Sequence, residues 1–188
     1  MLWLLLGCLS FAPLYLFDLN KLCRKSKAGG LLFVLGIFGI LLCTVMAYLG
    51  GRTSFFVPRP LAVFFGALSA VSLCLMLYAL FFALPFGSTY KDADTQKVVS
   101  TGVYALCRHP GVIFFFFWYL FLWLATGKPL LLVCAAVFTA MDVVHVWVQD
   151  RYLFPRSLTG YAEYQKATPF LIPNRKSISA FFKTWKIF

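Results

Sequence analysis

Residues 110–148 read PGVIFFFFWYLFLWLATGKPLLLVCAAVFTAMDVVHVWV, and they carry the strongest structural signal in the chain. Two apolar runs, Pro110–Thr126 and Pro129–Val148, are separated only by Gly127 and Lys128. Each run has roughly the length of a helix that crosses the hydrocarbon core of a membrane, which needs about 20 mostly apolar residues. Because so short a link joins them, the runs are predicted to form a tight antiparallel hairpin whose open ends return to the same membrane surface.

The composition of the whole chain points the same way. Of the 188 residues, 62% are hydrophobic and 19% are aromatic, while only 12% are charged. This balance excludes an ordinary soluble domain, and it also excludes a disordered chain, which needs low hydrophobicity and high charge. We therefore expect an all-α fold: a polytopic membrane protein with about five transmembrane helices. The three further spans are predicted at residues 1–17, 30–50 and 61–86.

The positive charges predict the orientation of the chain in the membrane. Of the 17 Lys and Arg residues, 14 follow the first, third and fifth spans, and only Arg52, Arg59 and Lys128 lie in the alternate loops. Cytoplasmic loops carry the excess of Lys and Arg, so the N-terminus is predicted outside and the C-terminus in the cytosol. The basic residues are scattered along the membrane edges and form no continuous groove, so no nucleic-acid partner is expected.

Three regions are predicted along the chain: a three-span bundle (1–86), a core of loop, hairpin and tail (87–173), and an interfacial amphipathic helix (174–188). In the third region a single helical stripe carries only apolar residues, as a helix lying in the membrane interface requires; it consists of Ile178, Phe181, Phe182 and Trp185. Residues 87–109 and 149–173 are polar, aromatic and rich in Gly and Pro. These two segments are the candidates for function.

The hairpin brings polar residues together at its open ends. Arg108 and His109 precede its first helix and Gln149 and Asp150 follow its second, so the four are predicted to meet at the cytosolic surface. Pro110 suits the first turn of a helix. A guanidinium, an imidazole and free N–H groups at one helix start favour a carboxylate or phosphate site. The alternative is that Arg108 marks the membrane boundary and binds lipid phosphate.

A second polar group lies inside the fifth span. Asp142 and His145 are three residues apart, and Gln149 follows four residues later, so the three share a helical face. An acid and a histidine in a span face either a cavity or each other. We keep three interpretations open: an Asp–His pair that holds helices together, a substrate pocket at the cytosolic edge, and a proton pathway.

Residues 101–110 read TGVYALCRHP. This decapeptide resembles the TGxYxxxRHP signature of the isoprenylcysteine carboxyl methyltransferase and phospholipid methyltransferase superfamily of integral membrane enzymes. The segment after the hairpin keeps, without a gap, the spacing of the family's second pattern, EExxLxxxFGxxYxxYxxxVPxxIP, through Leu153, Tyr161, Tyr164, Pro169, Ile172 and Pro173. The chain departs from the second pattern at Gln149-Asp150, where the family has two glutamates, and at Ser157-Leu158, where it has Phe-Gly. It also departs just after the RHP motif, where Val112 and Phe114 replace the family's Tyr and Gly.

The resemblance implies S-adenosylmethionine-dependent methyl transfer to a lipid or small hydrophobic acceptor at the cytosolic membrane face. It implies catalytic roles for Arg108, Asp150 and Gln149, and a place for Asp142 and His145 beside the acceptor. The implied donor-binding residues are Gly102, Tyr104, His109, Pro110, Tyr161 and Tyr164. A prenylated cysteine carboxylate, a lipid amine and a small thiol all stay open as acceptors.

No metal site is expected, since no CxxC or other metal-ligand spacing is present. A bacterial cytoplasmic membrane is the expected location, because the C-terminus shows no retention or lipidation signal. The oligomeric state is left open. Two other function classes remain: a non-catalytic family member that serves as a membrane scaffold or lipid-binding module, and an NADPH-dependent membrane reductase, for which no phosphate or ribose motif is found.

Overall fold

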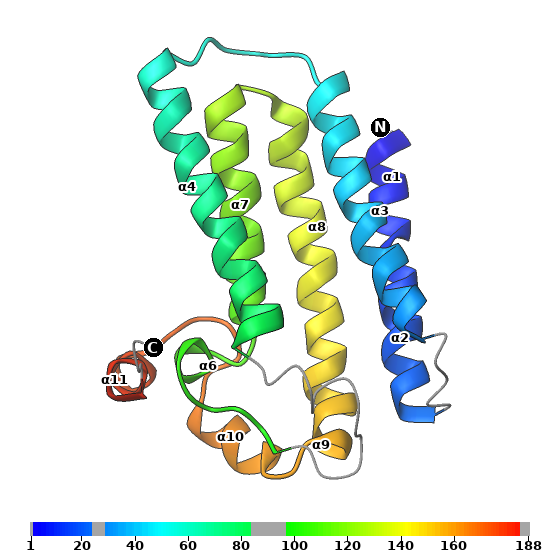
Figure 1. The fold of residues 1–188 in the computed structure, drawn as a ribbon, viewed down its shortest axis with the longest axis vertical. Coiled ribbons are helices and arrows are strands. Elements are labelled where there is room, and N and C mark those ends of the chain that lie inside the picture. The colour runs from blue at the N-terminus through cyan, green and yellow to red at the C-terminus, as the bar shows by residue number, and fades with distance from the viewer. Residues whose placement is uncertain (1, 24–28, 84–96, 185–188) are drawn as a thin grey trace. The chain divides into compact units, whose positions relative to one another are not determined.

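The computed structural model describes residues 2–23, 29–83 and 97–184, and Figure 1 shows them as a ribbon. Within these ranges the secondary structure is helical, apart from one isolated β-bridge between Lys97 and Thr159. The predicted all-α class is confirmed. Some predictions fall outside the described residues: the end of the third span (84–86), the first part of the 87–109 loop (87–96), the end of the amphipathic helix (185–188), and the basic residues Arg24, Lys25, Lys27, Lys91 and Lys186.

The first half of the chain forms α1 (Leu2–Leu9), α2 (Phe11–Cys23), α3 (Gly29–Gly50), α4 (Arg59–Leu77) and the π-helical turn η1 (Tyr78–Phe82). The second half forms α6 (Val103–Leu106), α7 (Pro110–Thr126), α8 (Pro129–Val148), the π-helical turn η2 (Gln149–Leu153), α9 (Phe154–Ser157), α10 (Tyr161–Ala167) and α11 (Arg175–Thr184).

Within the part of the chain that the structure describes, four helical segments are long and apolar enough to cross a membrane: Leu2–Cys23, Gly29–Gly50, Arg59–Phe82 and Pro129–Ser157. The predicted fourth span forms α7, an apolar helix of 17 residues, which lies at the lower end of the usual range for a spanning helix. The polytopic membrane fold is therefore confirmed, while the orientation of the termini stays a prediction. The last segment continues beyond the predicted end at Val148, because the polar residues that follow find partners within the chain.

The first span is divided between α1 and α2 by Ser10. Pro13 explains the break, since a proline has no N–H for the carbonyl four residues earlier, and its ring clashes with that carbonyl. Pro13 therefore cannot donate to the carbonyl of Leu9. At the break itself, the backbone N–H and the hydroxyl of Ser10 both donate to the carbonyl of Leu6, at 3.0 and 2.8 Å. The chain thus passes the proline without leaving the helical path.

The structure divides into two compact units. The first comprises residues 1–72 and 115–147, and its helices α1 and α2 both pack against α3. Small residues permit these close approaches: a Cβ at Gly36 of α3 would lie 2.5 Å from the side chain of Leu14 in α2, and a Cβ at Gly7 of α1 would lie 2.1 Å from the ring of Phe138. Polar side chains also join helices in this unit, because the hydroxyls of Thr44 and Tyr119 share a hydrogen bond.

The predicted tight hairpin is formed: α7 and α8 are joined at one end by a short turn, which lies in the first unit (Figure 1). Gly127 adopts φ +65°, a left-handed conformation that glycine accepts without steric cost. A side chain at this position would also meet the carbonyl oxygen of Phe55 at 2.4 Å. The Gly127 carbonyl accepts a hydrogen bond from the N–H of Ser54 at 2.9 Å, which ties the turn to the segment after α3.

The second unit comprises residues 73–114 and 148–188. It holds both π-helical turns, the short helices α6, α9 and α10, and α11, which packs against α6. This unit also holds the described parts of the two candidate functional segments, which are residues 97–109 and 149–173. The predicted division of the chain at residues 86 and 173 stays a prediction.

Candidate functional site

The signature segment 101–110 forms a short helix between two sharp changes of backbone direction. Gly102 adopts φ +59° at the start of α6, where a residue with a side chain would be strained. Cys107 is fully extended, with φ −158° and ψ 165°, so α6 ends there. Helix α7 then begins at Pro110, as its place in the sequence predicts. Arg108 and His109 consequently lie on an extended connection between two helices.

Arg108 forms a bidentate ion pair with Asp150, the second residue of η2. Its Nε donates to Asp150 Oδ1 at 2.8 Å, and its Nη2 donates to Oδ2 at 3.0 Å. Both side chains are nearly buried, with 12% and 11% of their surfaces exposed. The pairing confirms that the start of α7 and the end of α8 approach each other, as the hairpin geometry predicts. Parallel N–H bonds to one carboxylate are among the strongest polar contacts in proteins.

Three further side chains donate to the same carboxylate. Tyr161 donates its hydroxyl to Asp150 Oδ1 at 2.5 Å, and His109 Nε2 lies 3.3 Å from that oxygen. Gln165 donates through Nε2 to Oδ2 at 3.1 Å and to the backbone carbonyl of Asp150 at 2.9 Å. We call Arg108, His109, Asp150, Tyr161 and Gln165 the Asp150 cluster. The buried carboxylate of Asp150 is compensated by the positive charge of Arg108 and by hydrogen bonds from His109, Tyr161 and Gln165.

The backbone after α10 closes over the signature segment. Arg108 Nη1 donates to the carbonyls of Gln165 and Thr168 at 2.8 and 2.9 Å. The backbone N–H groups of Arg108 and His109 donate to the carbonyls of Pro169 and Phe170 at 2.9 and 3.3 Å. Four of the five N–H groups of the guanidinium are thus used within the chain. This arrangement favours a positioning role for Arg108.

Aromatic rings surround the imidazole of His109. The ring of Phe154 is stacked on it with centroids 6.0 Å apart, and Phe170 meets it edge-on at 5.1 Å. Phe170 also lies under the guanidinium of Arg108, 5.6 Å from its centroid, in cation–π geometry. Tyr161 extends the series, with its ring 5.4 Å from Phe154. The imidazole of His109 is therefore buried, with aromatic rings on two of its sides.

Tyr104 and Tyr164 join α6 to η1 and α10. Tyr164 donates its hydroxyl to the backbone carbonyl of Tyr104 at 2.8 Å, and Tyr104 donates its own hydroxyl to the carbonyl of Ala79 in η1 at 2.9 Å. A π-helical turn presents carbonyl groups outside the regular helical ladder, and such turns are frequent at functional sites. These bonds hold the signature helix in place from two sides.

Burial governs the ionisation of the site's phenols and thiol. Burial raises the pKa of Tyr161 above its ordinary value, and the hydrogen bond to the Asp150 carboxylate raises it further. Burial likewise raises the pKa of Tyr164, assisted by Tyr104. The pKa of the Cys107 thiol is raised to about 11 by burial, against a small opposing effect of its backbone hydrogen bond. All three groups are therefore neutral at physiological pH.

The remaining predicted residues lie outside the Asp150 cluster. Asp142 and His145 lie on the part of α8 that belongs to the first unit. His145 does not pair with Asp142: its Nε2 lies 2.8 Å from Asp18 Oδ2 of α2, and the ring of Tyr15 meets it edge-on with centroids 4.7 Å apart. Gln149 begins η2 and is half-buried. The interpretation of Asp142 and His145 as a pair is therefore replaced by a pair between His145 and Asp18, which joins α8 to α2.

Four residues of these clusters were not expected from the sequence: Phe154, Gln165 and Phe170 in the second unit, and Asp18 in the first. Asp18 had a usable signal, because an acid near the end of an apolar helix needs a partner. Phe170 follows a Thr-Pro pair in a polar segment, but nothing local distinguishes it from an interfacial aromatic. Gln165 has no local signal.

One comparison with known proteins identifies a family. Residues 61–153 match the sequence model of the phospholipid methyltransferase family. The match runs from Leu61 to Leu153, so it covers α4 from its third residue, the signature segment, the hairpin and η2, but not residues 154–173, which complete the Asp150 cluster. No curated protein and no solved structure matches the chain. On the family match, together with the TGxYxxxRHP signature, the chain belongs to the superfamily of membrane methyltransferases that includes the phospholipid and isoprenylcysteine carboxyl methyltransferases.

Proposed function

We propose that this protein is an S-adenosylmethionine-dependent methyltransferase that acts on a lipid or small hydrophobic acceptor at the cytosolic face of a membrane. The single observation that carries the proposal is the match of residues 61–153 to the phospholipid methyltransferase family, a family of methyltransferases that act on membrane lipids. The apolar helices support a location within a membrane. The proposed location of the protein is a bacterial cytoplasmic membrane.

The chemistry of the second unit supports the proposal. S-adenosylmethionine would supply a methyl group that is already activated as a sulfonium, so the protein has to orient two molecules and exclude water. Aromatic faces attract a sulfonium cation, and Phe154, Phe170 and Tyr161 gather around the buried His109. The residues present therefore fit a cationic donor with an aromatic base.

Each cluster residue receives a role from its contacts. Arg108 and Asp150 use their polar atoms on each other and on the tail, so they act by positioning His109 and the segment 165–170. His109 and Tyr104 would bind the donor, with Gly102 and Pro110 shaping the backbone around it and Tyr161 and Tyr164 closing it from the tail. Gln149 would supply neutral hydrogen bonds, and Asp142 and His145 would lie toward the acceptor.

One observation favours the alternative of a non-catalytic membrane module. The polar atoms of the Asp150 carboxylate all have partners within the chain, as they would in a purely structural cluster. Gln149 also replaces a family carboxylate with a neutral amide. The two functions therefore differ in a measurable property, which is whether the protein binds the methyl donor.

Calorimetry on the detergent-purified protein separates these functions. We expect S-adenosylmethionine to bind and NADPH not to bind, and we expect His109→Ala to abolish the first interaction. The matched control is Glu163→Gln, which neutralises an exposed carboxylate in α10, the same helix that carries Tyr161. Binding of NADPH alone would overturn the assignment, and binding of neither would support the membrane module. Transfer of a radiolabelled methyl group into extracted host lipids then identifies the acceptor.

A further inference from the structure

Helix α11 has three distinct faces. Successive residues of an α-helix lie about 100° apart, so its side chains divide into strips along the axis. One strip, with Ser177 at its centre, is buried or half-buried; Ala180, Phe181 and Thr184 complete it. This strip is the one that packs against α6, and Thr184 accepts a hydrogen bond at Oγ1 from the N–H of Gly102 at 3.2 Å.

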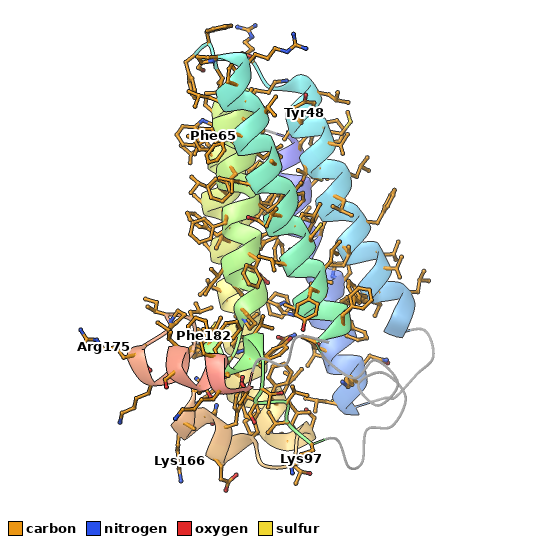
Figure 2. All side chains as sticks on the ribbon, turned by 60° about the vertical axis from the view of Figure 1, so that its left-hand side comes forward. Tyr48, Phe65, Lys97, Lys166, Arg175 and Phe182 are labelled. Carbon is orange, nitrogen blue, oxygen red and sulfur yellow. The ribbon has the colours of Figure 1, made fainter. Side chains whose placement is uncertain are left out.

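The second strip is apolar and exposed. Ile178 is 42% exposed and Phe182 is 73% exposed, and Ile172, just before the helix, is 84% exposed. Figure 2 shows Phe182 projecting from α11. Exposed aromatic and aliphatic side chains on one strip of a short helix are costly in water. In an integral membrane protein they are typical of a helix that lies in the membrane interface.

The third strip is basic and exposed. Arg175, Lys176 and Lys183, together with Ser179 and Ala180, line an open hollow of about 430 Å³ on the helix surface. Within the described ranges none of the three cations forms an ion pair, and the helix itself carries no acidic residue. The strip therefore presents a concentrated positive charge beside the exposed apolar strip.

The position of two of these cations has a cost for the helix itself. Arg175 and Lys176 are its first two residues, where the positive end of the helix dipole disfavours positive charge. The helix instead secures its start by reciprocal hydrogen bonds between Asn174 and Ser177, each 2.9 Å long, in the manner of a capping box. The cations thus oppose the stability of the helix, which argues that they serve a ligand of opposite charge.

We propose that α11 binds the headgroups of acidic phospholipids through Arg175, Lys176 and Lys183 while Ile178 and Phe182 enter the acyl region. Charge complementarity selects acidic lipid over zwitterionic lipid, and the adjacent apolar strip selects a lipid surface over a free phosphate. Because the opposite strip of α11 contacts α6 and Gly102, lipid binding stabilises the signature segment. Acidic lipid at the membrane surface is therefore a regulator of the candidate site.

Hydrogen exchange of the full-length protein in nanodiscs tests the proposal without relying on any enzymatic activity. We expect phosphatidylglycerol, added to phosphatidylcholine nanodiscs, to increase amide protection in residues 175–184 and 101–106. The variant Arg175→Gln/Lys176→Gln/Lys183→Gln abolishes this increase. In phosphatidylcholine alone the same variant keeps or gains protection in α11, because removing the two N-terminal cations relieves their conflict with the dipole.

The matched control is Lys97→Gln/Arg156→Gln/Lys166→Gln, which removes the same charge from exposed positions of the same unit. Figure 2 shows Lys97 and Lys166 projecting from that unit. Native mass spectrometry of the delipidated protein with short-chain phosphatidylglycerol measures the affinity for acidic lipid. Each basic residue near an acidic surface contributes about fivefold in affinity, so the α11 variant binds about 100-fold more weakly while the control retains its affinity.

Three results would overturn the proposal: equal protection of α11 in both lipid compositions, an undiminished response in the α11 variant, or an equal loss in the control. Failure of these measurements leaves the methyltransferase assignment untouched, because donor binding is measured separately by calorimetry. If the protein binds the methyl donor but shows no response to acidic lipid, only the proposed regulation by acidic lipid is refuted.

Discussion

The substitution Asp150→Asn removes the negative charge at the centre of the Asp150 cluster while keeping the shape of the side chain. In the native protein, Oδ1 accepts from Arg108, His109 and Tyr161, and Oδ2 accepts from Arg108 and Gln165. An asparagine amide replaces one oxygen by an NH₂ group, which is a donor only. Whichever way the amide points, at least two donors then face a donor.

The magnitude follows from the burial of the pair. With only 12% and 11% of the Arg108 and Asp150 side chains exposed, water cannot replace the lost charge. Removing one partner of a buried ion pair costs about 3–5 kcal/mol, because the other charge stays buried and uncompensated. The neutral amide oxygen keeps part of the hydrogen bonding. We therefore expect the lower end, about 3 kcal/mol, as a loss of local stability in the second unit.

Hydrogen exchange in detergent measures this loss directly. A cost of about 3 kcal/mol corresponds to roughly a 100-fold fall in amide protection. We expect the fall in peptides covering residues 104–112 and 158–170, since these two segments are tied together through the cluster. Glu163→Gln is the matched control and leaves protection unchanged, because its carboxylate is exposed.

A double-mutant cycle with Arg108→Gln completes the test. If the pair acts as a unit, the second substitution adds much less than its own cost, and the coupling is of the order of 1–3 kcal/mol. Wild-type protection in Asp150→Asn would refute the structural reasoning. Unchanged protection combined with lost donor binding would instead assign Asp150 a direct contact with the donor.

Three further predictions concern ionisation and packing. Because the folded-state pKa of Tyr161 is raised, its phenol contributes stability that is complete below the unfolded value of about 10 and lost as the pH rises toward the folded value; Tyr161→Phe should flatten the alkaline limb of a stability profile recorded by circular dichroism. Cys107, buried and with a pKa of about 11, should resist maleimide at pH 8 while exposed Cys23 reacts, as read by peptide mass spectrometry, and equal labelling would contradict the burial. Gly7→Ala should lower the thermal unfolding temperature, because a Cβ there would lie 2.1 Å from a ring carbon in α8 and overpacking costs about 1–3 kcal/mol, whereas Gly66→Ala, with open space around it, should not.

Apolar runs between turn residues were enough to predict the helices. The hairpin of α7 and α8, its turn at Gly127 and the start of α7 at Pro110 all appear as expected. The reason is physical: a backbone in hydrocarbon must satisfy its own hydrogen bonds, so a long apolar run has one available conformation. The extension of α8 through η2 was missed, because polar residues there suggested an end that their tertiary partners make unnecessary.

The approach of Arg108 to Asp150 was also predictable, because span length and a two-residue link leave the open ends of a hairpin side by side. The other hydrogen-bond partners of Arg108 and Asp150 could not be predicted. Tyr161 matched a family pattern, but Gln165 and Phe170 had no distinguishing signal, and His145 pairs with an acid 127 residues away rather than with its neighbour Asp142.

The amino-acid sequence by itself therefore determined which segments are helical, that they belong in a membrane, and which two segments meet at the ends of the hairpin. Only the tertiary structure decided which donor satisfies which acceptor. Helix formation depends on contacts within about four residues, which a sequence displays as periodicity, whereas a buried ion pair depends on where distant helices place their side chains. That placement has no local signature, and in this protein it determines the candidate site.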